Sequence, residues 1–146
     1  MKQSTRIAVL AGAFMLCAGT LFGGTLYVPW FQDNGGPVGP DIVPPDGEAT
    51  YIRLQNVTGG AINVTVDYYG TSGLIHTNTG TLSPSEVWAW RPHGNQGLIP
   101  DSGGAVTQTV MSAVISWPGG TNTDIVGNMI TINTNGSRLG VNLVAP

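Results

Sequence analysis

The chain has 146 residues, of which only 9% are charged, and its formal net charge is −3. Its 22 glycines and 10 prolines, with many Thr, Asn and Val residues, are typical of turns and strands and predict one mainly β domain. Its five Lys and Arg residues do not cluster as phosphate neutralisation requires, so we expect no nucleic-acid partner.

Residues 1–24 have the pattern of a secretory signal peptide. Lys2 and Arg6 precede an uncharged apolar run from Ile7 to about Gly24. The run is also long enough for a short transmembrane helix, so a retained anchor is the alternative, and the cleavage position stays undecided. We expect a secreted protein, extracellular or at the cell surface, with no stable membrane span once the leader is removed.

The only cysteine of the chain, Cys17, lies inside this leader. Lipidation at Cys17 is disfavoured because Leu16 replaces the small residue expected before a lipoprotein cysteine. The exported part is therefore predicted to have no disulfide and no thiolate metal site.

Residues 25–31, TLYVPWF, predict a short apolar strand. Three partners are open for it: an edge of its own domain, the sheet of a neighbouring subunit by strand addition, or a membrane interface. The candidate subunit-contact residues are its large apolar side chains: Leu26, Tyr27, Val28, Trp30 and Phe31.

Residues 32–48 contain four prolines and four glycines and predict a linker or long surface loop. Its acidic residues make it a weak calcium candidate, because carboxylate oxygens on loops suit a hard cation. The candidate ligands are Asp33, Asp41, Asp46 and Glu48. Their spacing does not match an EF-hand, so a solvated linker without a cofactor is the favoured interpretation.

Residues 49–146 predict an immunoglobulin-like antiparallel sandwich of about seven strands, since short alternating runs are separated by turn residues. The clearest run is 61–69, in which Ile62, Val64, Val66 and Tyr68 point inward. The polar run 74–82 is expected at a sheet edge. The expected core that would accept residues 25–31 consists of Ile52, Leu54, Ile62, Val64, Val66, Leu139, Val141 and Leu143.

Two features suggest binding of sugars or attachment of glycans. Trp88, Trp90 and Trp117 favour a core role, with a sugar-stacking platform as the alternative. Three sequons place candidate glycosylation at Asn56, Asn63 and Asn135 in a host that has the pathway.

Catalytic residue types are sparse. His76 and His93 are the only histidines, and no G-x-S-x-G motif accompanies Ser83, Ser85 or Ser102. His93 with Asp101 and one of these serines is the only imaginable catalytic set, so we expect a protein that is not an enzyme.

The order of leader, apolar strand 25–31, Pro/Gly linker and cysteine-free sandwich resembles prokaryotic donor-strand surface-fibre subunits, from TLYVPWF to VNLVAP. The resemblance implies a secreted structural protein that forms a homo-oligomeric filament or surface layer through its N-terminal strand. The alternative from another class is a secreted carbohydrate-binding or adhesive module that uses the tryptophans.

Overall fold

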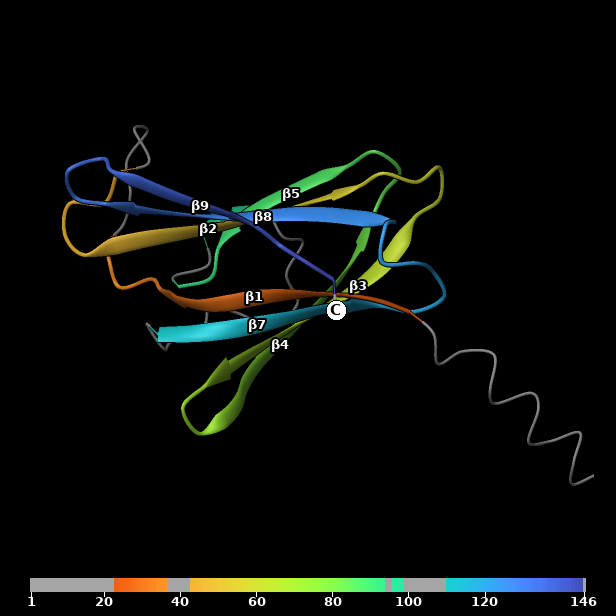
Figure 1. Cartoon of the computed structure of the whole chain (residues 1–146), viewed down its shortest axis with the longest axis horizontal. Coiled ribbons are helices and arrows are strands. Elements are labelled where there is room, and N and C mark those ends of the chain that lie inside the picture. The colour runs from red at the N-terminus through yellow and green to blue at the C-terminus, as the bar shows by residue number, and fades with distance from the viewer. Residues whose placement is uncertain (1–22, 37–42, 94–95, 99–109, 146) are drawn as a thin grey trace, which may run out of the picture.

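The fold is an all-β sandwich of two antiparallel sheets (Figure 1). The structure is a computed structural model that describes residues 23–36, 43–93, 96–98 and 110–145. One sheet has the strand order β1-β7-β3-β4, and the other has the order β6-β5-β2-β8-β9. The prediction of a sandwich is confirmed, and within the described residues all regular elements are strands.

The strands have the following bounds: β1 Gly24–Gln32, β2 Glu48–Asn56, β3 Ile62–Gly70, β4 Gly73–Leu82, β5 Val87–Arg91, β6 Gln96–Leu98, β7 Val110–Trp117, β8 Ile125–Asn133 and β9 Arg138–Asn142. The short β6 was not expected, because its residues lie in a stretch rich in Gly and Pro. No helix in the part of the chain that the structure describes is long and apolar enough to cross a membrane.

Alternation along the strands explains which side chains form the core. In β3, Val64, Val66 and Tyr68 are buried while Ile62 is half-buried, as the period of two predicts. The polar β4 is an edge strand, as expected, and pairs with β3 on one side only. Its hairpin with β3 turns at Gly73, whose φ of 107° is a conformation that favours glycine.

The expected core is correct apart from Leu139. Leu143 is buried and Val141 is packed against the core, but Leu139 is 65% exposed. Leu139 has the inward phase of Val141, yet β9 is an edge strand, and at Leu139 it borders a groove instead of the opposing sheet. The prediction that Leu139 is a core residue was therefore wrong.

Candidate functional site

The N-terminal strand β1 is paired inside its own chain. It lies antiparallel to β7 in seven register pairs, from Gly24 opposite Trp117 to Gln32 opposite Val110. The register shifts between Val28 and Phe31, so Pro29 and Trp30 both point outward and Phe31 returns to the core.

The five candidate contact residues fall into two groups. Leu26, Val28 and Phe31 are at most 5% exposed and belong to the core of the sandwich, whereas Tyr27 and Trp30 are about half exposed. The strand thus supplies core side chains that come from outside the 49–146 region, and it presents two aromatic rings to solvent.

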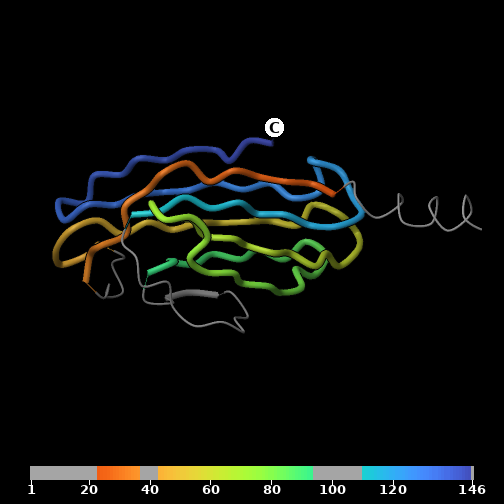
Figure 2. Tube along the Cα trace, turned by 90° about the horizontal axis from the view of Figure 1, so that it is seen from below, coloured from red at the N-terminus to blue at the C-terminus, as the bar shows by residue number. Residues whose placement is uncertain are grey.

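β1 and the C-terminal residues run along the same edge of the sandwich (Figure 2). The backbone N–H of Tyr27 donates to Val144 O at 3.2 Å, and the N–H of Thr25 donates to Asn122 Oδ1 at 2.9 Å. The next alternate position is Pro29, which has no N–H to offer. From Thr25 to Pro29 the outward donors of β1 are therefore satisfied or absent, as in edge strands that resist pairing with another chain.

Two open grooves border β1. The larger, of about 530 Å³, has Leu26 and Leu143 among its apolar residues and Arg53 and Asn142 among its polar ones. The smaller, of about 260 Å³, is lined in part by Trp30 and Leu139, two of the exposed large apolar side chains. Grooves and exposed apolar side chains therefore coincide along the β1 edge.

A buried ion pair joins the residue after β1 to the other sheet. Arg91 Nε, at the end of β5, donates to Asp33 Oδ1 at 2.5 Å, and the two side chains are 1% and 0% exposed. Arg91 also donates through Nη1 to Gly36 O at 2.8 Å and through Nη2 to Gly35 O. Burial raises the pKa of Asp33, and the nearby Arg91 opposes that shift.

The Asp33 carboxylate also accepts backbone N–H groups from β2 and from the residue two positions after the end of β5. His93 N donates to Oδ2 at 2.8 Å, and Thr50 N makes a longer contact of 3.4 Å to Oδ1. The pairing of β2 with β5 begins where Ile52 lies opposite Trp90, and Thr50 and His93 lie just outside this pair. Asp33 therefore serves these two strands as an acceptor at the point where their own pairing stops.

Two of the four calcium candidates, Asp33 and Asp46, use carboxylate oxygens in contacts with the protein. Asp33 is held by Arg91, and Asp46 Oδ1 accepts the N–H of Gly36 at 2.5 Å. The backbone N–H of Glu48 donates to Asn34 Oδ1 at 2.9 Å, and Asp41 lies outside the described residues. Among the described residues no group of three or more His, Cys, Asp or Glu side chains has the arrangement of a metal site.

The three sequons differ in access. Asn63 and Asn135 are exposed. Asn56 is fully buried, and its Nδ2 donates to the carbonyls of Gly60, Leu82 and Ser83. In the folded chain Asn56 is thus inaccessible, because the atom that would carry the glycan is buried and bonds to the carbonyls of a turn.

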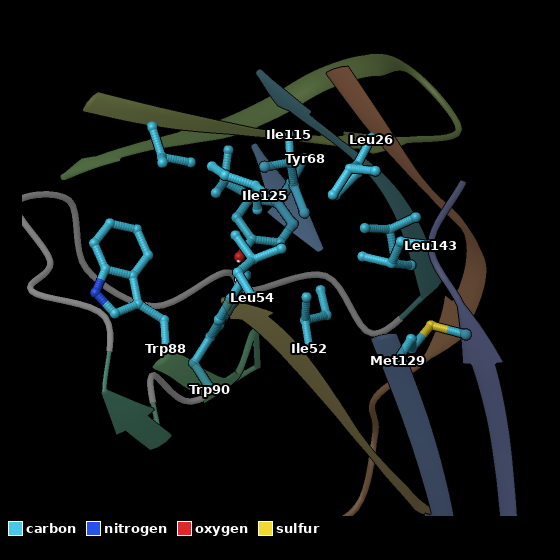
Figure 3. Packing of buried hydrophobic residues seen from close by; sticks show 14 of the residues in the cluster. Leu26, Ile52, Leu54, Tyr68, Trp88, Trp90, Ile115, Ile125, Met129 and Leu143 are labelled. Carbon is cyan, nitrogen blue, oxygen red and sulfur yellow. Dashed lines mark hydrogen bonds between the residues drawn. The ribbon is translucent and has the colours of Figure 1, made fainter. Parts of the chain in front are cut away.

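The tryptophans predicted to form either the core or a sugar platform are buried. Trp88, Trp90 and Trp117 are at most 2% exposed, and Trp88 and Trp90 lie among aliphatic residues of the core (Figure 3). Trp90 Nε1 donates to the hydroxyl of Tyr68 at 2.6 Å. Stacking on a sugar needs an open ring face, so these three rings form no exposed platform.

The residues considered for catalysis lie apart or have other contacts. His76 is on β4, with its ring centroid 6.1 Å from that of Tyr68, while His93 lies beside Asp33. Ser83 N donates to Glu86 Oε2 at 2.6 Å, within a turn before β5. Asp101 and Ser102 lie outside the described residues.

Arg91 is a site residue that was not predicted from the sequence. A signal was present, because Arg91 is one of only three arginines after residue 24 and follows directly after the apolar run Val87–Trp90. A cation at the end of a buried strand needs a nearby anion. The sequence does not identify that anion, since Asp33 is distant in the chain and belongs to a segment that was interpreted as a linker.

Fold and site together define an all-β sandwich whose first strand completes the core and is fastened by a buried ion pair. The fold is similar to that of the crystal structure of Thermotoga maritima 1070, with a TM-score of 0.55 and 10% identity over 85% of this chain and 95% of that chain. At this identity the likeness shows the fold alone. No protein-family model matches the sequence. No curated protein matches it either.

Proposed function

We propose that this chain is a secreted structural protein, not an enzyme, that assembles into an extracellular filament or surface layer by passing β1 into the sheet of the next subunit. The observation that carries the proposal is the position of β1. It fills the core with Leu26, Val28 and Phe31 and pairs with β7, yet a Pro/Gly-rich segment separates it in sequence from β2.

Exchange of β1 costs little in contacts. A neighbour's β1 makes the same hydrogen bonds and fills the same core positions as the chain's own strand, which is the principle of domain swapping. A single chain that holds its own β1 and an assembly with exchanged β1 strands therefore differ mainly in the path of the segment that connects β1 to β2. Because exchange joins two molecules, a higher protein concentration favours the assembly by mass action. A head-to-tail contact of this kind does not close on itself and grows into a filament.

The connection suits such an exchange. Residues 37–45 include four prolines, and proline-rich linkers act as semi-rigid spacers between domains. A spacer of this kind would let each domain keep its own β2 while β1 is passed to a neighbour. Low charge also suits close packing of copies, because repulsion between them is small.

The protected edge of β1 favours exchange over simple addition. A strand added beside β1 finds the N–H groups of Thr25 and Tyr27 already bonded and finds none at Pro29. Replacing β1 by a neighbour's β1 restores all of these bonds. We therefore place the joint between β1 and β7.

A disulfide across the β1–β7 pair tests the proposal. Tyr27 lies opposite Val114, and because Tyr27 N points to Val144 O, the two residues form a non-hydrogen-bonded pair with close side chains. The variant Tyr27→Cys/Val114→Cys is made in a Cys17→Ser background, which removes the only native cysteine. Oxidised assemblies are then separated by non-reducing electrophoresis.

Exchange predicts a ladder of covalent multimers from assembled material and an internally linked monomer from dilute protein. The single variants Tyr27→Cys and Val114→Cys are the controls and yield no ladder. Electron microscopy of the same material shows whether it is fibrous. Fibres that release only internally linked monomers would contradict strand exchange, and a chain that never assembles would contradict the structural role.

A deletion gives a second, independent readout. Removing Thr25 to Phe31 takes three core side chains and the β7 partner away together. We expect a soluble or unstable monomer, measured by sedimentation and by thermal unfolding. Assembly at the wild-type level without these residues is incompatible with the proposal.

A further inference from the structure

We propose that the unit passed between subunits is residues 23–36, and that each joint is fastened by Asp33 of the donor on Arg91 of the acceptor. This inference rests on the proposed strand exchange and adds to it the residue pair that selects the correct strand. The partner is a second copy of this chain.

Arg91 is the fixed half of the pair. It ends β5, in the sheet that does not contain β1, so it stays with the acceptor domain. Its guanidinium is buried and donates to three groups of the segment that follows β1: Asp33 Oδ1, Gly35 O and Gly36 O. A buried guanidinium that loses its carboxylate is strongly disfavoured, because water does not replace the lost contacts.

Asp33 is covalently tied to the exchanged strand. It directly follows Gln32, which is paired with Val110, and it is two residues after the buried Phe31. Since the chain advances at most about 3.6 Å per residue, the subunit that supplies Phe31 must also supply Asp33. In an exchanged joint the Asp33–Arg91 pair is therefore formed between two molecules.

The segment after Asp33 is also held by the acceptor. Asn34 N and Gly35 N donate to Glu48 O at 3.0 and 2.8 Å, and Gly36 N donates to Asp46 Oδ1 at 2.5 Å. Residues 46–48 lead directly into β2, so they belong to the acceptor domain. These contacts extend the exchanged unit to Gly36 and place the connection to the donor's own domain after it.

The pair also provides selection. An unrelated apolar strand can fill the positions of Leu26, Val28 and Phe31, because hydrophobic contacts discriminate weakly between similar side chains. Without an acid two residues after the last core residue, it leaves the buried Arg91 without this carboxylate and the N–H of His93 without its acceptor. Specificity of this kind arises from the penalty on the wrong partner.

Charge exchange between two full-length variants tests the inference. Asp33→Arg and Arg91→Asp each place like charges at the joint when a variant is alone. In an equal mixture, the Asp33 strand of the second variant meets the native Arg91 of the first, and the reversed pair forms at alternate joints. We expect assembly, measured by sedimentation and electron microscopy, from the mixture and from neither variant alone. Wild-type assembly by Asp33→Arg alone overturns the inference.

Peptide competition gives a result even if these variants fold poorly. Synthetic peptides of residues 23–36 and 23–32 are added during assembly of the wild-type chain. The longer peptide is expected to inhibit at about tenfold lower concentration, and Asp33→Asn in that peptide is expected to abolish the advantage. Equal inhibition by both peptides overturns the pair but leaves strand exchange intact. Inhibition by neither peptide, together with no ladder from the Tyr27→Cys/Val114→Cys chain, counts against the exchange itself.

Discussion

The indole N–H of Trp90 donates to the hydroxyl of Tyr68 at 2.6 Å, which joins the two sheets through the core. Both residues are at most 2% exposed. The replacement Tyr68→Phe leaves the Trp90 N–H buried without this acceptor and is expected to lower the free energy of unfolding by about 1–3 kcal/mol.

Urea denaturation of the wild type, Tyr68→Phe, Trp90→Phe and the double variant measures this cost as a double-mutant cycle. The double variant is expected to be more stable than the sum of the two single losses indicates, because no orphaned donor remains. Additive losses would mean that the hydrogen bond contributes no coupling between the sheets.

Gly24, the first residue of β1, has no room for a side chain. A Cβ at this position would lie 1.9 Å from Cζ2 of the buried Trp117. We expect Gly24→Ala to destabilise the domain by about 1–3 kcal/mol, as overpacking does. The matched control is Gly60→Ala, where a Cβ meets no atom within 4 Å. Equal denaturation midpoints for the two variants would show that β1 does not pack closely against Trp117.

We expect the turn before β8, residues 121–124, to stabilise the folded protein less in acid than at neutral pH. The N–H and hydroxyl of Thr121 bond to Asp124 and lower the pKa of its carboxyl below the ordinary value of 3.8. A lowered folded pKa means that the stabilisation is present above the pKa of the unfolded chain and is lost as the pH falls through the folded pKa. The carboxylate is exposed, so the effect is modest.

Denaturant unfolding of the wild type and Asp124→Asn at neutral and acidic pH checks this sign. The wild type is expected to be the more stable at neutral pH, and the difference is expected to shrink as the pH falls below 3.8. Glu86, whose pKa is lowered by contacts with Ser83, predicts the same direction for Glu86→Gln. A difference that grows in acid would refute the assignment.

The accessibility of the sequons predicts where glycans attach. In a host with an N-glycosylation pathway, Asn63 and Asn135 are the expected sites because their side chains are exposed, and Asn56 is expected to stay unmodified. Mass spectrometry of glycopeptides tests this directly. The replacements Asn63→Gln and Asn135→Gln should each remove one glycan from a doubly modified chain, and a glycan on Asn56 of folded protein would disprove the prediction.

Local pattern was enough to predict much of the fold. Alternation in β3 identified Val64, Val66 and Tyr68 as inward residues, and the polarity of β4 marked it as an edge strand. The same reasoning favoured a core role for Trp88 and Trp90, which are two apart on β5 and both buried. These predictions succeeded because burial of one strand face depends on side chains that are neighbours in sequence.

The exposure of Leu139 and the burial of Asn56, which local pattern did not indicate, depend on distant neighbours. Leu139 has the inward phase of β9 but lies at a sheet edge where the opposite layer does not cover it. Asn56 has the sequence of a glycan acceptor, yet carbonyls from residues 60, 82 and 83 surround its amide. Neither the edge position of β9 nor the approach of residues 82 and 83 is encoded in the nearby sequence.

The sequence alone determined that this is a mainly β chain with an apolar strand ahead of a Pro/Gly-rich segment, because composition and alternation are local properties. Only the tertiary structure decided that β1 pairs with β7 and that Asp33 forms an ion pair with Arg91, 58 residues away in the sequence. The reason is that a buried carboxylate and guanidinium find each other through the packing of two sheets, and sequence spacing does not report that packing.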